Sequence, residues 1–147
     1  MIGKQTKGTS FSGCVCYVLR EDKSKLLEAV GVEGTPEQMA EQFELQTLLN
    51  DKVKNTVGHT SLNFSPEDGE RLKTDDALML QIAHDYMAKM GIENTQYIVA
   101  RHTDREHPHC HIVFNRVDND GKTISDKNDF YRNEKVCNSN CSAICSG

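Results

Sequence analysis

The residues best suited to chemistry lie between positions 101 and 115, a stretch that holds four of the chain's six histidines. Residues 97–100 form a short run rich in β-branched side chains, and residues 109–117 alternate with a period of two, so both are predicted strands joined by a tight loop. Side chains alternate between the two faces of a strand. An antiparallel pair would therefore bring His102 opposite His109 and His111 on one face of a sheet.

Three imidazoles that converge from rigid strands are a suitable ligand set for a catalytic metal. Divalent metals bind neutral imidazole nitrogen, and three protein ligands leave positions open, whereas structural sites are closed and commonly use thiolates. Neutral ligands also leave the positive charge of the ion intact, which suits a phosphate substrate or activation of water. The alternative is a polar sheet face with satisfied histidines, and three of them on one face favour the metal. Asp104 lies two residues after His102 and could orient a ligand ring.

The other three histidines receive different interpretations. His107 breaks the alternation and lies in the predicted loop, so we interpret it as a surface or DNA-facing residue. His59 and His84 are isolated in the sequence, and for both we expect a structural role.

Helices and further strands must position these side chains. Ser10 and Thr35 are predicted N-caps, the latter followed by Pro36, and Gly91 is a predicted C-terminal cap. Strands are predicted over residues 2–7, 25–32, 57–65 and 122–125, and helices over residues 11–21, 36–55, 76–90 and from about 128. Residues 65–70 and 118–121 are predicted turns. The pattern predicts an α+β domain, with a mainly antiparallel sheet of about four or five strands flanked by helices.

The helical patterns also predict which side chains face the core. In the helix over residues 36–55, the inward positions are Met39, Phe43, Leu45 or Gln46, Leu49 and Val53. In the helix over residues 76–90, they are Met79, Ile82, Ala83, Tyr86 and Met90.

Tyr17 is the tyrosine best placed to act as a nucleophile. It lies beside the apolar stripe of the first predicted helix, which comprises Phe11, Cys14, Val15 and Val18. Tyr86 lies on a buried stripe, Tyr97 faces the side of the sheet opposite His102, and Tyr131 lies in the uncertain last helix. A phenol needs a nearby cation or base before it attacks phosphorus. From spacing alone, a partly buried packing tyrosine remains the commoner alternative.

Composition limits the classes of function. The chain has 147 residues, 37% hydrophobic residues and a mean hydropathy of -0.60, which suits one domain with a core. No apolar run approaches the roughly 20 residues of a membrane span, and no secretory signal precedes the first strand. We therefore expect a cytoplasmic protein with reduced cysteines. The formal net charge of -5 argues against bulk nonspecific nucleic-acid binding, although it permits a local basic groove.

Three motifs resemble those of the relaxase, or mobilisation nuclease, family of HUH-type endonucleases from conjugative and mobilisable elements. Residues 8–19 resemble the first motif, residues 59–67 the second, and residues 102–115 the third, in the order His-x-Asp-x-x-x-Pro-His-x-His-x-x-x-Asn. The histidine motif is highly specific, and the resemblance spans about residues 1–136.

The resemblance implies a function and a mechanism. Tyr17 would be the nucleophile, and His102, His109 and His111 would bind a divalent metal, Mg²⁺ or Mn²⁺ in the family, although Zn²⁺ or Ni²⁺ could occupy a nitrogen-rich site. Asp104 would orient a ligand or assist deprotonation. The substrate would be single-stranded DNA at an origin of transfer, with accessory mobilisation proteins as partners, and we expect a monomer. The candidates for DNA contacts or positioning are Lys4, Ser61, Arg101, Arg105, Asn115 and Arg116.

Two rival functions remain open from the sequence. One is a zinc-dependent hydrolase that activates water and uses no tyrosine, and the other is a noncatalytic DNA-binding module. We expect residues 1–136 to form the relaxase domain, truncated at its C-terminal end. Residues 137–147 are small, polar and aperiodic, and we interpret them as a disordered tail or an expression scar.

Overall fold

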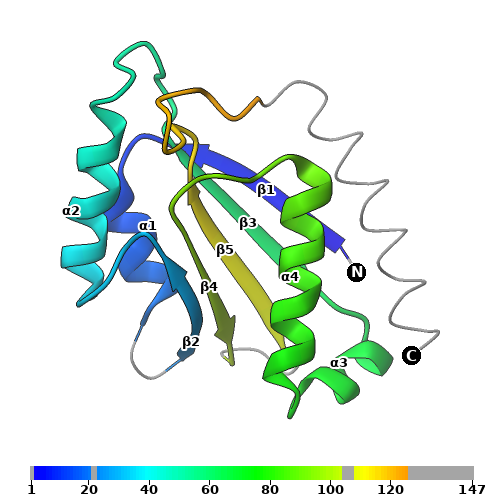
Figure 1. The fold of residues 1–147 in the computed structure, drawn as a ribbon. Coiled ribbons are helices and arrows are strands. Elements are labelled where there is room, and N and C mark those ends of the chain that lie inside the picture. The colour runs from blue at the N-terminus through cyan, green and yellow to red at the C-terminus, as the bar shows by residue number, and fades with distance from the viewer. Residues whose placement is uncertain (1, 21–22, 104–107, 126–147) are drawn as a thin grey trace.

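The computed structural model describes residues 2–20, 23–103 and 108–125. They form a five-stranded sheet in the order β1-β3-β5-β4-β2, and every neighbouring pair is antiparallel (Figure 1). The strands are β1 (Ile2–Gly8), β2 (Ser24–Val30), β3 (Val57–Asn63), β4 (Tyr97–His102) and β5 (His109–Asn115). The predicted α+β class with a mainly antiparallel sheet is confirmed.

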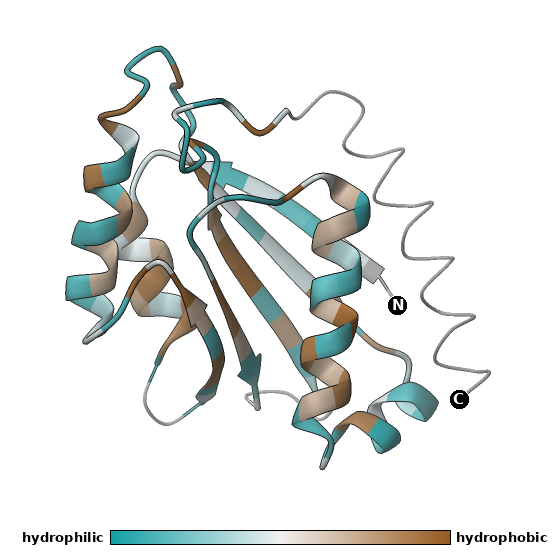
Figure 2. Ribbon diagram, viewed as in Figure 1, coloured by the Kyte–Doolittle hydropathy of each residue, from teal (hydrophilic) through white to brown (hydrophobic). Residues whose placement is uncertain are grey.

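Helices cover both faces of this sheet. On one face, α1 (Phe11–Val18) and α2 (Pro36–Thr47) pack together and against β5, and on the other lies α4 (Asp76–Met90), preceded by the short α3 (Pro66–Leu72) (Figure 1). Each face has its own apolar cluster. The central strand β5 is buried along its whole length, and hydrophobic residues predominate along it in Figure 2.

The predicted start of α2 and both predicted ends of α4 are confirmed. Thr35 and Gln38 form a capping box at the start of α2, with Pro36 in its first turn. The Asp75 side chain accepts a hydrogen bond from the Leu78 amide at the start of α4, and Gly91 ends that helix with a φ of 77°. All five predicted inward residues of α4 are buried.

The prediction for α2 was wrong beyond Thr47. The helix ends eight residues before the predicted position, and Leu45 and Leu49, expected inward, are 66% and 59% exposed. Of the two predicted alternatives Leu45 and Gln46, Gln46 is the one that turns inward, and its side-chain amide donates to the Val117 carbonyl at 2.9 Å. The chain leaves the helix through a turn in which the Asn50 side chain accepts from the Lys52 amide at 3.1 Å. Such side-chain hydrogen bonds compete with helix continuation.

Three smaller predictions also need correction. The first helix ends at Val18, not at residue 21, and the Ser10 side chain makes no capping hydrogen bond. The predicted turn over residues 65–70 is α3, because the Ser65 side chain accepts from the Asp68 amide and Pro66 occupies the first turn. Residues 122–125 contribute one isolated bridge, Val117 to Thr123, in place of an edge strand.

The predicted last helix, Tyr131 and the tail from residue 137 lie outside the described residues. Among the helices within the described ranges, none combines the length and apolar character that crossing a membrane requires.

Candidate metal centre and nucleophile

Three histidines meet where β4 and β5 pair. His102 lies directly opposite His109, and His111 lies opposite Ala100, so all three side chains project from the same face. All three are buried, and one ring nitrogen of each lies within 4.8 Å of the others. The rings of His102 and His111 are closest, with centroids 3.9 Å apart. The predicted convergence of these imidazoles is therefore confirmed.

The carbonyl of Val18 fixes the orientation of His102. Val18 is the last residue of α1, where carbonyls lack intrahelical partners, and its oxygen lies 2.7 Å from His102 Nε2. Because a carbonyl only accepts, Nε2 must carry the proton, and the lone pair of a neutral ring is then on Nδ1. The end of α1 thus sets which nitrogen His102 can offer to an ion.

His59, which is isolated in the sequence, belongs to the same cluster in the structure. Its Nε2 lies 2.7 Å from Nδ1 of His111, and their rings stack with centroids 5.0 Å apart. Burial, with a contribution from His102, lowers the pKa of His59 below its usual range. Two sequence signals could have identified His59 as a member of the cluster. They are the alternating pattern of β3 and the position of His59 in the second motif.

Tyr17 reaches the histidine cluster from the last turn of α1. Its side chain is 45% exposed, and its ring centroid lies 5.8 Å from that of His102, 6.0 Å from His111 and 6.5 Å from His59. The Arg20 guanidinium lies over the Tyr17 ring, with Cζ 4.8 Å from the ring centroid. The Tyr17 ring therefore lies beside the histidine cluster, and a cation lies over the same ring.

Thiols are poor alternatives to this tyrosine. Burial raises the pKa of Cys14 to about 11 and that of Cys110 to about 12. Burial and the adjacent Glu37 carboxylate also raise the pKa of Cys16. Because the thiolate is the nucleophilic form, these shifts disfavour the three cysteines of the described residues as nucleophiles.

The donor set fits a divalent ion. Neighbouring nitrogen ligands of a bound ion lie about 3 Å apart, given bonds of about 2.1 Å. The three nitrogens here lie within 4.8 Å of one another, so modest ring rotations would bring them into contact with a common ion. Three protein nitrogens would also leave coordination positions of such an ion for a substrate oxygen.

Two of the predicted DNA-contacting residues share the histidine face. Ser61 on β3 pairs with His111, and Lys4 on the edge strand β1 pairs with Ser61, so the three form one row across the sheet. The Ser61 hydroxyl also accepts a hydrogen bond from the Asn63 side-chain amide at 3.1 Å. Lys4 is exposed and Ser61 is half-buried.

The structure does not bring Arg101, Arg116 or Asn115 to the histidines. Arg101 follows Ala100 and precedes His102, so it faces α4, where its Nε donates to Asp76 at 2.7 Å. Arg116 donates to the carbonyls of Asn55 and Ile124.

Asn115 is a structural residue at the far end of β5. Its amide donates to the Phe43 carbonyl and to Gln96 Oε1, each at 2.9 Å, and its own Oδ1 accepts from the Val117 amide at 3.0 Å. Asp104, Arg105 and His107 lie outside the described residues.

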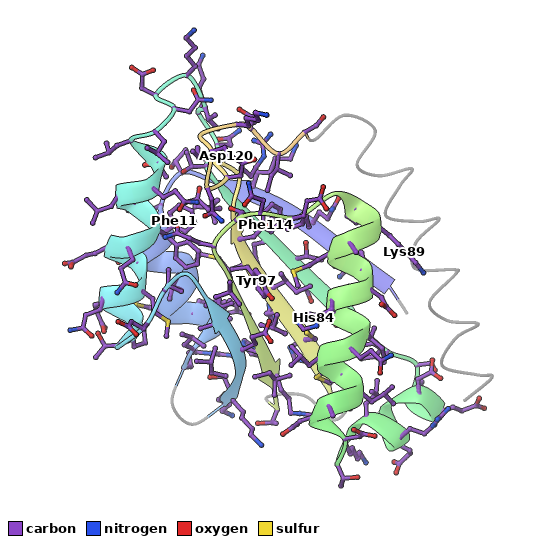
Figure 3. All side chains as sticks on the ribbon, in the orientation of Figure 1. Phe11, His84, Lys89, Tyr97, Phe114 and Asp120 are labelled. Atoms are coloured by element: carbon purple, nitrogen blue, oxygen red, sulfur yellow. The ribbon has the colours of Figure 1, made fainter. Side chains whose placement is uncertain are left out.

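His84 has the structural role that the sequence predicted. It projects from α4 toward the opposite sheet face, and its Nε2 lies 2.8 Å from Glu28 Oε1 (Figure 3). The Tyr97 hydroxyl donates to the same carboxylate. This cluster, which comprises Glu28, His84 and Tyr97, ties β2, β4 and α4 together.

An antiparallel sheet that presents three imidazoles beside a helix-borne tyrosine defines a class of candidate phosphoryl-transfer site. The chain belongs to the relaxase family: the model of the MobA/VirD2-like nuclease domain matches residues 17–144. DNA nicking is therefore its general activity, and the family resemblance predicted from the motifs is confirmed. Comparison with curated proteins and with solved structures gave no significant match.

Proposed function

We propose that this domain nicks single-stranded DNA at an origin of transfer by transesterification, with Tyr17 as the nucleophile. The supporting observation is the position of the Tyr17 ring, 5.8–6.5 Å from the rings of His59, His102 and His111. Its Oη forms a bond to phosphorus while the bond from phosphorus to the 3′ oxygen breaks. The phenol proton passes to a base, and the released 3′ oxygen takes up a proton. The product is a 5′-phosphotyrosyl adduct, which a 3′ hydroxyl can reverse.

His102, His109 and His111 would hold a divalent ion, Mg²⁺ or Mn²⁺ by family resemblance, with Zn²⁺ or Ni²⁺ as possible occupants. When bound, such an ion supplies positive charge that neutralises the scissile phosphate. The histidines themselves need fixed tautomers to offer lone pairs, and the Val18 carbonyl provides this for His102. We retain Asp104 as a proposed orienting or proton-accepting residue.

Substrate binding would follow the exposed part of the histidine face. Lys4 lies in a row with Ser61 and His111, so its ammonium can contact a backbone phosphate of a strand that crosses β1 and β3. Arg105 remains a proposed phosphate contact from the loop between β4 and β5. Accessory mobilisation proteins, a monomeric state, a cytoplasmic location and a domain boundary near residue 136 also remain proposals.

Covalent trapping tests the proposal. The protein is incubated with Mn²⁺ and a randomised single-stranded DNA pool labelled at the 3′ end, and the products are separated on denaturing gels. The label should migrate with the wild-type protein and not with Tyr17→Phe, because only the phenol oxygen can form the adduct. Tyr97→Phe is the matched control, since this tyrosine lies on the opposite face.

Other outcomes would favour the rival functions. Cleavage that survives Tyr17→Phe would indicate a hydrolase that activates water. Binding on native gels without cleavage by the wild-type protein would indicate a noncatalytic DNA-binding module. Either result would contradict the proposed transesterification.

A further inference from the structure

The contact between His59 and His111 joins a histidine outside the predicted ligand set to one within it. His59 lies on β3 opposite Val113, two residues from the Ser61 position that faces His111. Its ring therefore reaches His111 along the diagonal of the strand pair, a distance that long side chains can span. The two nitrogens, His59 Nε2 and His111 Nδ1, are 2.7 Å apart, which is a hydrogen-bond distance.

We propose that His59 is a positioning residue that holds His111 in the tautomer and ring orientation required for metal binding. This inference rests on the proposed function, because it assumes that the histidine cluster receives an ion. It assigns to the second motif a role within the metal centre.

The chemistry of the contact allows two arrangements, and only one is compatible with a ligand. A hydrogen bond between two neutral imidazoles needs one N–H donor and one lone pair. If His59 donates, the proton of His111 lies on Nε2, and that nitrogen cannot bind an ion. If His111 donates through Nδ1–H, its Nε2 carries the lone pair. Metal binding therefore selects His59 as the acceptor.

A comparison with His102 shows what this contact adds. The Val18 carbonyl can only accept a hydrogen bond, so it allows only the His102 tautomer with the proton on Nε2. His111 has a histidine as its partner, so the same outcome depends on the ring of His59 offering Nε2 as an acceptor. Partners that orient ligand histidines in this way commonly contribute 10–100-fold to metal affinity, by the order of magnitude seen in other proteins.

The ring contacts of His111 indicate what the loss of His59 would change. The ring of His111 packs against those of both His59 and His102, with centroids 5.0 Å and 3.9 Å away. Removal of one neighbour opens space for the His111 ring to rotate. Rotation would move Nε2 relative to the nitrogens of the other two histidines, which now lie within 4.8 Å.

The first experiment uses the metal-free protein and therefore does not depend on the proposed function. Long-range ¹H–¹⁵N correlation spectra of the side chains report which nitrogen of each histidine carries the proton. We expect the Nδ1–H tautomer for His111 in the wild-type protein. We also expect that His59→Leu produces a mixture of tautomers. A wild-type spectrum with the His111 proton on Nε2 would overturn the proposal without any variant.

The second experiment measures Mn²⁺ affinity by calorimetry for the full chain. We expect His59→Leu to weaken binding by about 10–100-fold, and His59→Gln, whose amide can place an acceptor near the former Nε2, to restore most of it. His84→Leu is the matched control, because it removes a half-buried histidine from the opposite face and should leave affinity unchanged.

The outcomes separate failure of this inference from failure of the proposed function. If the wild-type protein binds Mn²⁺ and His59→Leu binds it equally well, the positioning role is wrong. If the wild-type protein binds no divalent ion, the proposed function is contradicted. In that case the spectra still test the contact, because a His111 tautomer unaffected by His59→Leu would refute it. Circular dichroism confirms that each variant is folded.

Discussion

The two faces of the sheet carry the same residue types in different arrangements. On the α1 side, His59, His102, His109 and His111 cluster beside Tyr17. On the α4 side, His84 and Tyr97 share the carboxylate of Glu28.

The difference lies in what each histidine contacts. His84 contacts the carboxylate of Glu28. Burial alone would raise the pKa of this carboxyl group, but the hydrogen bonds from Tyr97 and His84 lower it on balance. The histidines of the α1 side meet one another, and no described carboxylate lies among the candidate ligands that converge there. A histidine with an acidic partner is an ordinary structural feature, whereas several neutral imidazoles that face one another form a ligand set.

The largest expected effect separates the two faces directly. His102→Ala should reduce the nicking rate by about a hundredfold or more, because it removes a ligand of the proposed ion. His84→Ala should leave the rate near that of the wild type. Single-turnover cleavage of the recovered DNA substrate measures both rates. Equal losses of nicking rate in the two variants would contradict a catalytic centre on the α1 side of the sheet.

Core substitutions sharpen the comparison, because each face has its own apolar cluster. Phe43 stacks on Phe11 with ring centroids 4.6 Å apart, and both side chains are fully buried. Phe43→Ala should lower the free energy of unfolding by about 3–5 kcal/mol, and Met79→Ala, on the α4 side, by about 2–5 kcal/mol. Urea denaturation measures both values.

Activity should distinguish these two core variants. Phe11 anchors α1, which carries Tyr17, so Phe43→Ala should also reduce nicking at temperatures where the protein remains folded. Met79→Ala should reduce nicking only in proportion to the unfolded fraction. Identical activity per folded molecule would argue against a role for α1 packing in placing the nucleophile.

A smaller effect is expected at Arg20. Its guanidinium lies 4.8 Å from the Tyr17 ring centroid, and contacts of this kind contribute about 0.5–2 kcal/mol. Arg20→Gln should therefore slow nicking by about 2–30-fold, with little change in DNA affinity. Arg71→Gln removes the same charge from α3 and serves as the control. A rate unchanged by Arg20→Gln would exclude a contribution of this stacking contact.

The smallest effect concerns stability on the α4 side. The hydrogen bond from Lys25, assisted by Arg101, lowers the pKa of Asp76. The stabilisation by its carboxylate is present above the unfolded-state pKa of about 4 and is lost as pH falls through the lower folded-state pKa. The stability difference between wild type and Asp76→Asn should therefore be larger at pH 6 than near pH 3. A difference that grows toward acid would contradict the ion pair, and urea denaturation at the two pH values measures it.

Much of the site was predictable because it depends on strand periodicity. The alternation of residues 109–117 placed His109 and His111 on one face, and a short loop made the pairing with His102 antiparallel. These are local features that sequence encodes directly. The same alternation, applied to Arg101, would have placed it on the opposite face from His102.

Other features depend on contacts between distant segments. His59 joins the cluster because β1 and β5 flank β3, an order that no local pattern specifies. The Asn115 side-chain amide donates hydrogen bonds to Phe43 and Gln96, which lie 72 and 19 residues away in the chain. The end of α2 was missed because Leu45 and Leu49 continue a helical apolar pattern without burial. Tertiary packing, and not local propensity, decides these positions.

The most direct test of the central claim is the location of Mn²⁺ by anomalous diffraction from crystals of the protein. We predict one peak about 2 Å from ring nitrogens of His102, His109 and His111, with the Tyr17 side chain on its open side. A peak at Glu28 and His84 on the other face, or a peak at the three histidines with Tyr17 turned away from it, would contradict the account.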